Sequence, residues 1–150
     1  MTSPLPTAGY SATPLPRKLG LMPGQKVAFV ALPDALAGLA EAEAFDDVVR
    51  ARAADELGPV EARDLIHAFY LRAAELELAL GCLKAAIKPN GMIWISWPKK
   101  AAKVDTDITE DVVRRSALQR GLVDVKVCAV DEVWSGLKLV IPVAQRADSR

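Results

Sequence analysis

The sequence predicts a three-layer α/β domain with a mostly parallel sheet, preceded by an extended N-terminal arm. Short apolar runs of strand length alternate with segments rich in helix-forming residues. One run, residues 92–97, is almost continuously apolar, which is typical of a strand covered by helices on both faces. Only a short turn separates the last two runs, so we expect those two strands to pair antiparallel.

The N-terminal arm is predicted over residues 1–16, because four prolines fix the backbone there and favour extended geometry in their neighbours. A short helical turn follows at residues 17–19 and ends at Gly20. The first strand, residues 26–32, comes after a Pro-Gly turn. A single domain is therefore expected over residues 17–150.

The next segment, residues 35–44, is rich in Ala, Leu and Glu and predicts a helix with Asp34 as its N-terminal cap. Residues 46–56 fit either a short strand or a continued helix. Both readings stay open, because Gly58 and Pro59 break the pattern in either case.

The most regular helix is predicted over residues 73–88, between strands at residues 64–71 and 92–97. The Pro-Asn-Gly sequence at residues 89–91 is expected to end this helix sharply. Its apolar face repeats at helical spacing and consists of Leu76, Leu80, Leu83 and Ile87.

A second regular helix is predicted over residues 107–120, where Asp107 and Glu110 have the spacing of a capping box. A final strand, residues 137–143, follows the Ser135-Gly136 turn. Between them, residues 122–130 predict a strand that alternates between two faces, with Val123, Val125, Val127 and Ala129 on one face and Asp124, Lys126 and Cys128 on the other.

This order of elements is Rossmann-like, and a parallel sheet that ends in an antiparallel hairpin is the layout of the S-adenosylmethionine-dependent methyltransferase fold. The likeness concerns topology and assigns no function. The glycine-rich turn of nucleotide-binding versions is missing, because Ala-Leu-Pro-Asp follows the first strand at residues 31–34. The missing turn argues against ordinary binding of dinucleotides, S-adenosylmethionine or nucleoside triphosphates, and the cofactor stays unknown.

Composition excludes several other classes of protein. The 150 residues include 19 basic and 19 acidic side chains, so bulk charge does not favour nucleic acid or anionic lipid, although a local basic patch stays open. The sequence has neither a membrane-spanning apolar run nor a secretory signal, which predicts a cytoplasmic protein. Two Cys and one His predict no disulfide framework and no metal site.

The densest polar cluster follows the apolar run at residues 92–97. Trp97, Lys99, Lys100 and the later Thr109 stand where a buried strand leads to a helix N-terminus, which favours a pocket for a small anion. The alternative is a solvated loop whose lysines pair with the acids at positions 105 and 107.

A second cluster surrounds the predicted Ser-Gly turn and contains Asp131, Trp134, Ser135 and Lys138. Trp134 is placed to stack on a ligand, while the alternative is that it covers the edge of the core. His67 lies in an apolar run, which predicts a core residue rather than a catalyst.

The two cysteines, Cys82 and Cys128, suggest a redox pair if they approach one another. The preferred alternative is two unreactive thiols in a reducing compartment. Cys82 also lies on a strip with Leu78 and Ala85 outside the main apolar face of its helix, and this strip is a candidate dimer contact.

Several stretches together resemble the small bacterial proteins grouped as domain of unknown function 3052. They are AGYSATPL at residues 8–15 with KLG at 18–20, ISWPKK at 95–100 with DITED at 107–111, and GLVDVKVCAVDEVWSGLK at 121–138. The resemblance covers nearly the whole chain except residues 41–61. It implies no established activity, but it adds Tyr10 and Ser11 to the candidate ligand-binding residues.

The leading hypothesis is a cytoplasmic binding or regulatory protein with a degenerate methyltransferase-like fold, without catalytic activity and acting as a homodimer. The alternative is an enzyme that binds a small anion, a nucleotide or S-adenosylmethionine in a pocket formed by Lys99 and Lys100.

Overall fold

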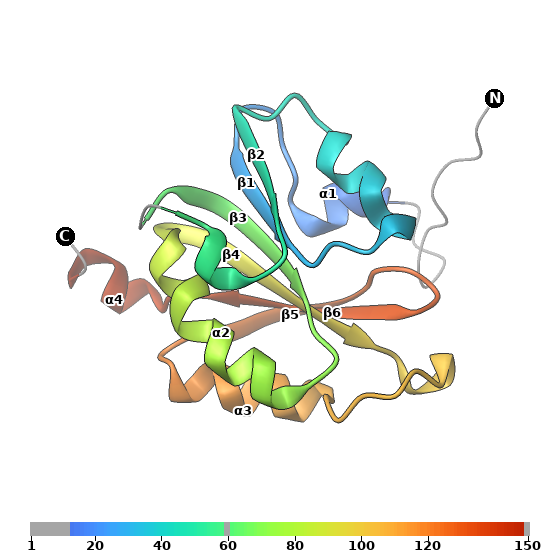
Figure 1. The fold of residues 1–150 in the computed structure, drawn as a ribbon. Coiled ribbons are helices and arrows are strands. Elements are labelled where there is room, and N and C mark those ends of the chain that lie inside the picture. Colours follow the sequence, from blue (N-terminus) through green and yellow to red (C-terminus); the bar gives the residue numbers. More distant parts are fainter. Residues whose placement is uncertain (1–12, 59–60, 149–150) are drawn as a thin grey trace.

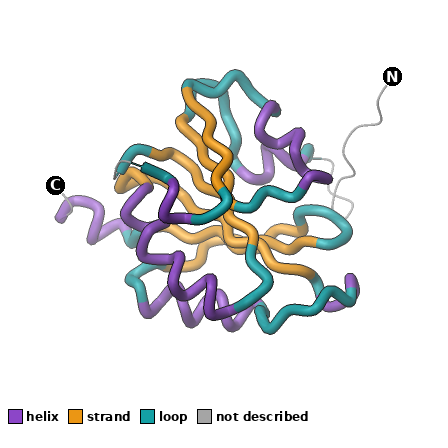
Figure 2. Tube along the Cα trace, viewed as in Figure 1, coloured by secondary structure: helices purple, strands orange, loops and turns teal. Residues whose placement is uncertain are grey.

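The computed structural model describes residues 13–58 and 61–148 (Figures 1 and 2). One sheet contains β1 (Lys26–Val30), β2 (Asp47–Ala51), β3 (Arg63–Phe69), β4 (Ile87–Pro98), β5 (Val123–Ala129) and β6 (Trp134–Val140). The α-helices are α1 (Leu15–Leu19), α2 (Ala73–Ala86), α3 (Glu110–Gln119) and α4 (Val143–Asp148). Three 3₁₀ segments complete the described chain, namely η2 (Asp34–Glu41), η3 (Ala54–Glu56) and η4 (Lys100–Ala102).

The sheet confirms the predicted fold class. Its strand order is β2-β1-β3-β4-β6-β5. Strands β2, β1, β3 and β4 are parallel neighbours, whereas β6 runs antiparallel to both β4 and β5. The last strand of the chain is therefore inserted inside the sheet, and β5 forms its edge.

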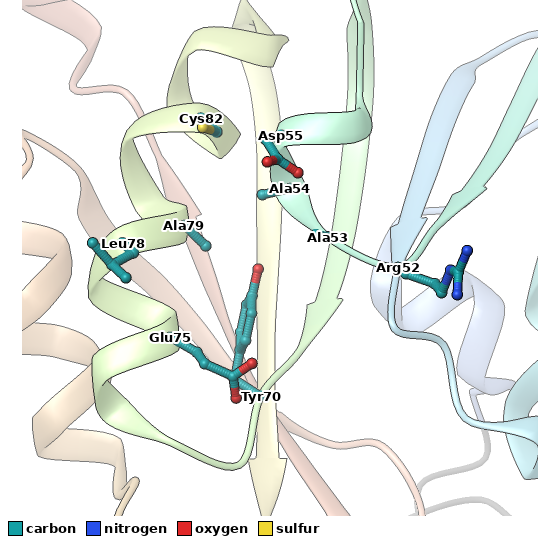
Figure 3. A pocket seen from close by; sticks show the side chains of 9 residues that line it. All are labelled: Arg52, Ala53, Ala54, Asp55, Tyr70, Glu75, Leu78, Ala79 and Cys82. Atoms are coloured by element: carbon teal, nitrogen blue, oxygen red, sulfur yellow. The ribbon is translucent and has the colours of Figure 1, made fainter.

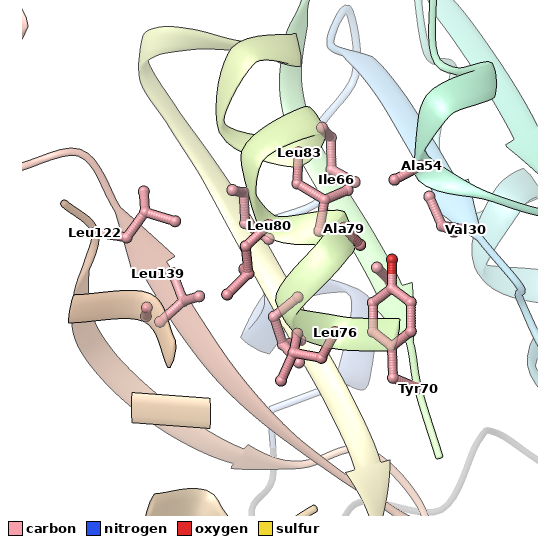
Figure 4. Close-up of a cluster of buried hydrophobic side chains, with 14 of the residues drawn as sticks. Val30, Ala54, Ile66, Tyr70, Leu76, Ala79, Leu80, Leu83, Leu122 and Leu139 are labelled. Atoms are coloured by element: carbon pink, nitrogen blue, oxygen red, sulfur yellow. The ribbon is translucent and has the colours of Figure 1, made fainter. Parts of the chain in front are cut away.

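Helical elements cover both faces of the sheet, which explains why the central strands do not alternate in polarity. Leu76, Leu80 and Leu83 of α2 pack with Ile66 and further sheet residues on one face, as Figure 4 shows. On the opposite face, α1 and η2 cover a second cluster. Successive residues of β1 divide between the two clusters, as expected for a strand between two layers.

The N-terminal boundary differs from the prediction, because α1 begins at Leu15 and that side chain is buried. The last residues of the predicted arm, from Leu15, thus belong to the folded domain. Residues 1–12 of the predicted arm lie outside the described residues. Gly20 ends α1 in the left-handed conformation with φ 84°, as predicted.

The helix predicted at residues 35–44 is the 3₁₀ segment η2, and Asp34 does not cap it through its side chain. Leu36 and Leu39 are its buried residues, and their spacing of three matches the three residues per turn of a 3₁₀ helix. The open segment at residues 46–56 resolves into strand β2 followed by η3.

The predicted Pro-Asn-Gly helix stop lies inside β4 instead. Ile87 pairs with Arg63 while Met92 pairs with Leu65, so residues 88–91 form an irregularity in the strand. A Cβ on Gly91 would lie 3.0 Å from the Arg63 carbonyl oxygen, which explains why this position is a glycine.

The predicted alternation of residues 122–130 holds from Lys126 to Ala129 but fails between Asp124 and Lys126, where β5 contains a register shift. Asp124 pairs with Leu139 and Lys126 pairs with Lys138, so one extra residue, Val125, lies between consecutive partners. This bulge puts Asp124 and Lys126 on opposite faces. Cys128, which was placed on the polar face, is buried.

Candidate functional site

Open parallel sheets bind ligands beyond the carboxyl ends of their strands, near the point where the strand order reverses. Here that reversal lies between β1 and β3. Two cavities contain residues that directly follow the carboxyl ends of parallel strands. One extends from the end of β4 to the start of α3, and the other lies between α2 and η3.

The first, which we call the lysine cavity, has a volume of about 490 Å³. It gathers five of the predicted site residues from the end of β4, the start of η4, the N-terminal cap of α3 and β6, namely Trp97, Lys99, Lys100, Thr109 and Ser135. Of the remaining wall, Pro98, Ile108 and Glu110 lie within the motifs quoted above, whereas Val104 and Thr106 belong to no predicted site. These two residues come from an irregular loop, where no periodic pattern exists to indicate which side chains turn inward.

The start of α3 corrects the predicted capping box. Thr109, not Asp107, is the N-terminal cap, and its hydroxyl accepts a hydrogen bond from the Val112 amide at 3.2 Å. Glu110, the cavity's acidic residue, forms a salt bridge with Arg114. Arg114 also bonds Asp111 at 3.0 Å and Asp124 at 3.1 Å, so one positive charge is shared among three carboxylates at this end of α3.

The alternative in which the loop lysines pair with neighbouring acids is wrong. Arg72 donates to Asp105 at 2.7 Å, and the Asp107 carboxylate accepts from the Ala73 amide at 2.7 Å. Within residues 13–58 and 61–148, neither Lys99 nor Lys100 forms an ion pair. Their positive charges are available to the lysine cavity.

Residues 105–107 bind the junction between β3 and α2 through three consecutive contacts. The Thr106 hydroxyl donates to the Leu71 carbonyl at 2.6 Å, and the flanking Asp105 and Asp107 make the contacts with Arg72 and Ala73 described above. The Asp107 carboxylate thereby occupies the N-terminus of α2, a position that often binds a ligand's anionic group in related folds. Hydrogen bonding to Asp105 raises the pKa of Arg72 and lowers that of Asp105.

The backbone after β1 also departs from that of nucleotide-binding sites. Ala31 has φ 56°, a left-handed conformation that normally favours glycine. The chain therefore makes a tight turn at this strand end without the glycine that would let a ligand approach the backbone closely.

The second predicted cluster separates into different structural roles. Asp131 accepts from the amides of Val133 and Trp134 at 2.8 and 2.7 Å, which fixes the turn before β6. Trp134 packs edge-on against Phe69 with ring centroids 5.2 Å apart. Neither residue lines the lysine cavity, and Ser135 is the member of this cluster that does.

Lys138 points to a different surface from the lysine cavity. It pairs across the sheet with Trp94 on one side and Lys126 on the other. Burial and the nearby Lys126 charge lower its pKa. The two remaining candidates, Tyr10 and Ser11, lie outside the described residues.

His67 is a core residue, as predicted. It is fully buried, and its Nε2 is hydrogen-bonded to Ser96 Oγ at 2.7 Å. Its ring stacks on Phe69 at a centroid distance of 4.2 Å. Burial lowers the pKa of His67 from 6.5 to about 3, so the imidazole is neutral.

The structure does not bring the two cysteines together. Cys82 is exposed on α2, which packs on one face of the sheet, while Cys128 is buried in the cluster on the opposite face. Because the sheet separates them, an intrachain disulfide would require unfolding. The candidate dimer strip is exposed, and its Leu78 side chain is 80% accessible.

The second cavity, which we call the tyrosine cavity, has a volume of about 300 Å³ and is shown in Figure 3. Tyr70, which directly follows β3, contributes an aromatic ring, and Asp55 and Glu75 contribute carboxylates. The sequence placed Tyr70 at a strand end but did not predict the two acids, because the cavity forms only when η3 packs beside α2.

Neither cavity is predicted to bind a metal. In the part of the chain that the structure describes, no three His, Cys, Asp or Glu side chains are grouped to hold a metal ion. Over the same residues, every helix is too short or too polar to span a bilayer.

Solved structures that resemble the chain have the S-adenosylmethionine-dependent methyltransferase fold. One such methyltransferase from Aquifex aeolicus has a TM-score of 0.60 and 17% identity, covering 84% of this chain and 87% of its own. A TehB-like enzyme from Corynebacterium glutamicum has a TM-score of 0.60 and 12% identity, covering 90% and 91%. The trans-methyltransferase CalH, solved with SAH, has a TM-score of 0.61 and 13% identity, covering 86% and 55%.

At these identities the structural likeness shows the fold alone. No family model and no curated protein matches the sequence. The chain is thus an α/β protein with a methyltransferase-like fold, and its activity must be argued from its own side chains.

Proposed function

We propose that this chain is a non-catalytic small-molecule-binding protein whose ligand places a carboxylate or phosphate group in the lysine cavity. The observation that carries the proposal is that Lys99 and Lys100 have no acidic partner in the part of the chain that the structure describes. Both line the cavity, and neither forms an ion pair within the described residues. The acids that follow them in sequence are bound to Arg72 and Ala73 instead.

The cavity wall defines the rest of the ligand. Trp97 and Ile108 supply buried apolar surface, while Ser135 supplies a hydroxyl group. Two lysine ammonium groups attract an anion without imposing the planar geometry of arginine. An anionic group attached to a compact apolar body fits this combination best.

The absence of catalysis is proposed from two features near the strand-order reversal. The Asp107 carboxylate occupies the N-terminus of α2, and Ala31 replaces the glycine expected after β1. Both features disfavour the binding of a nucleotide-like cofactor in the usual position.

A thermal-shift screen tests the lysine cavity. The probes are inorganic phosphate, nucleotides, S-adenosylmethionine and S-adenosylhomocysteine. A ligand present at 100 times its Kd should stabilise the protein by ~2.7 kcal/mol. The Lys99→Ala/Lys100→Ala variant should lose this stabilisation, whereas Lys103→Ala, on the same loop but outside the cavity wall, should retain it. No response to any probe would refute the proposed site.

The alternative function is an enzyme, and the fold shared with methyltransferases favours it. Transfer of a labelled methyl group from S-adenosylmethionine to a small acceptor distinguishes the two. Turnover that disappears in the Lys99→Ala variant would establish catalysis and overturn the binding-only proposal. Stoichiometric binding without turnover would support it.

We also propose that the chain belongs with the domain of unknown function 3052 proteins, acts in the cytoplasm and forms a homodimer. The motifs quoted above support the first of these. Sedimentation of the full chain tests the dimer, and a single monomeric species would contradict it.

A further inference from the structure

The tyrosine cavity is separate from the lysine cavity and has the opposite charge. Its residues come from the β2–η3 connection, from η3, from the end of β3 and from α2, and none of them also lines the lysine cavity. At about 300 Å³ it reaches the lower end of the range of small-molecule pockets, which is roughly 300 Å³. Ala54, Leu78 and Ala79 give it a largely apolar wall.

The Tyr70 hydroxyl lacks a partner at this site. The residue is only 7% exposed, and within the described residues its hydroxyl makes no hydrogen bond. Figure 3 shows it pointing toward Ala54, inside the ring of side chains that line the cavity. A buried hydroxyl without a partner destabilises a fold, so its presence beside a cavity indicates a group that pairs with it when bound.

Two carboxylates make the cavity negative. Asp55 lies on η3 and Glu75 on the first turn of α2, and neither forms an ion pair within residues 13–58 and 61–148. Arg52 also lines the cavity, but its side chain points away from the other lining residues in Figure 3, and it forms no ion pair with the two carboxylates within the described residues. Burial, and then the charge of Glu75, raise the pKa of Tyr70.

We propose that the tyrosine cavity binds a small organic cation, an ammonium or quaternary ammonium group on a compact apolar body. The positive group lies against the Tyr70 ring, whose electron-rich face attracts cations. Glu75 and Asp55 balance its charge, and Leu78 and Ala79 contact its apolar groups. An oxygen on the ligand accepts the hydrogen bond of the Tyr70 hydroxyl. The same carboxylates exclude anions from this site.

Choline and its neutral carbon isostere, in which carbon replaces the nitrogen, provide the test. The two have the same shape and differ in charge. Isothermal titration and thermal shift should show saturable binding of choline to the full chain and at least tenfold weaker binding of the isostere. Equal binding of both would reduce the site to an apolar cavity and overturn the proposal, as would no binding of choline.

Matched variants locate the binding. Glu75→Gln should weaken choline binding about tenfold, whereas Glu77→Gln, on the same helix but outside the cavity wall, should leave it unchanged. Tyr70→Phe should raise the Tm of the free protein, because it removes an unpaired hydroxyl, and yet weaken choline binding. A purely structural Tyr70 would change the Tm without changing choline affinity, and this result would contradict the proposed hydrogen bond.

Two further outcomes separate this site from other functions. The Lys99→Ala/Lys100→Ala variant should bind choline normally, so either proposal can fail without the other. If S-adenosylhomocysteine competes with choline and its binding also requires Tyr70, the cavity is a cofactor subsite and the cation proposal is overturned.

Discussion

The buried imidazole of His67 should make folding stability depend on pH in a range where few other groups titrate. His67 is the single histidine of the chain, and burial lowers its pKa from 6.5 to about 3 in the folded protein. The unfolded chain therefore binds a proton between these two values while the folded chain does not. The contribution of the neutral imidazole to the free energy of unfolding is therefore present above pH 6.5 and is lost progressively as the pH falls through this window.

The size of the effect follows from the two pKa values. Between pH 7.5 and 5.0 the unfolded state gains about 2 kcal/mol from protonating His67, because each pH unit below 6.5 contributes ~1.4 kcal/mol. The folded state gains almost nothing over the same interval. Tyr70, Cys128, Arg72 and Arg114 have raised pKa values and titrate above this range, and Asp105, whose pKa is lowered, titrates below it.

Urea unfolding at several pH values between 7.5 and 5.0 measures this dependence. His67→Gln keeps an amide group available to Ser96 Oγ but cannot titrate, so its stability should be flat over the interval apart from the background of the acids. If the wild type loses less than about 0.5 kcal/mol, or if the variant keeps the same slope, the assignment of a neutral buried imidazole is wrong.

Three further substitutions test the backbone and packing. Ala31→Gly should stabilise the protein by about 0.5–1 kcal/mol in thermal unfolding, because glycine adopts the left-handed φ of 56° without strain; unchanged stability would contradict this. Gly136→Ala should destabilise it by about 1–3 kcal/mol, because the new Cβ would lie 3.2 Å from both Trp94 and Val130; a neutral result would show that the core yields there. Asp107→Ala should cost about 1 kcal/mol through loss of the hydrogen bond to the Ala73 amide, while Asp107→Asn should recover part of it; equal losses would exclude a capping role.

Local patterns predicted the regular elements of the sheet and its two helical layers. Leu76, Leu80 and Leu83 gave α2 a face at helical spacing, and all three are buried. The short connection between the last two runs predicted the antiparallel pair of β5 and β6. These features depend on residues close in sequence, so one sequence is enough to detect them.

Features that depend on distant contacts were not predicted. The bulge at Val125 puts Asp124 and Lys126 on opposite faces of β5, and it becomes visible only in the pairing with β6. Likewise, Asp107 has the spacing of a local cap for α3 but caps α2, which lies more than 30 residues earlier. In both cases a tertiary contact replaces the partner that local spacing suggests.

The candidate site shows the same difference between residues that are close in sequence and residues that meet only through tertiary packing. Trp97, Lys99 and Lys100 were predicted together because they are adjacent at a strand end, and they meet in one cavity with Thr109 and Ser135. Lys138 is near Ser135 in sequence, but their separation by an odd number of residues puts them on opposite faces of β6. Asp55 and Glu75 had no shared pattern, because they meet only through the packing of η3 beside α2.

The position of β6 has a consequence for synthesis of the chain. Among the described strands β6 is made after β5, yet it lies between β4 and β5, so β5 has no neighbour to pair with until residues 134–140 have left the ribosome. Ser135 completes the wall of the lysine cavity at the same moment. A fragment that ends within α3 lacks β5, β6 and the part of the cavity wall that Ser135 forms. The lysine cavity is therefore complete only in chains in which β6 has paired with β4.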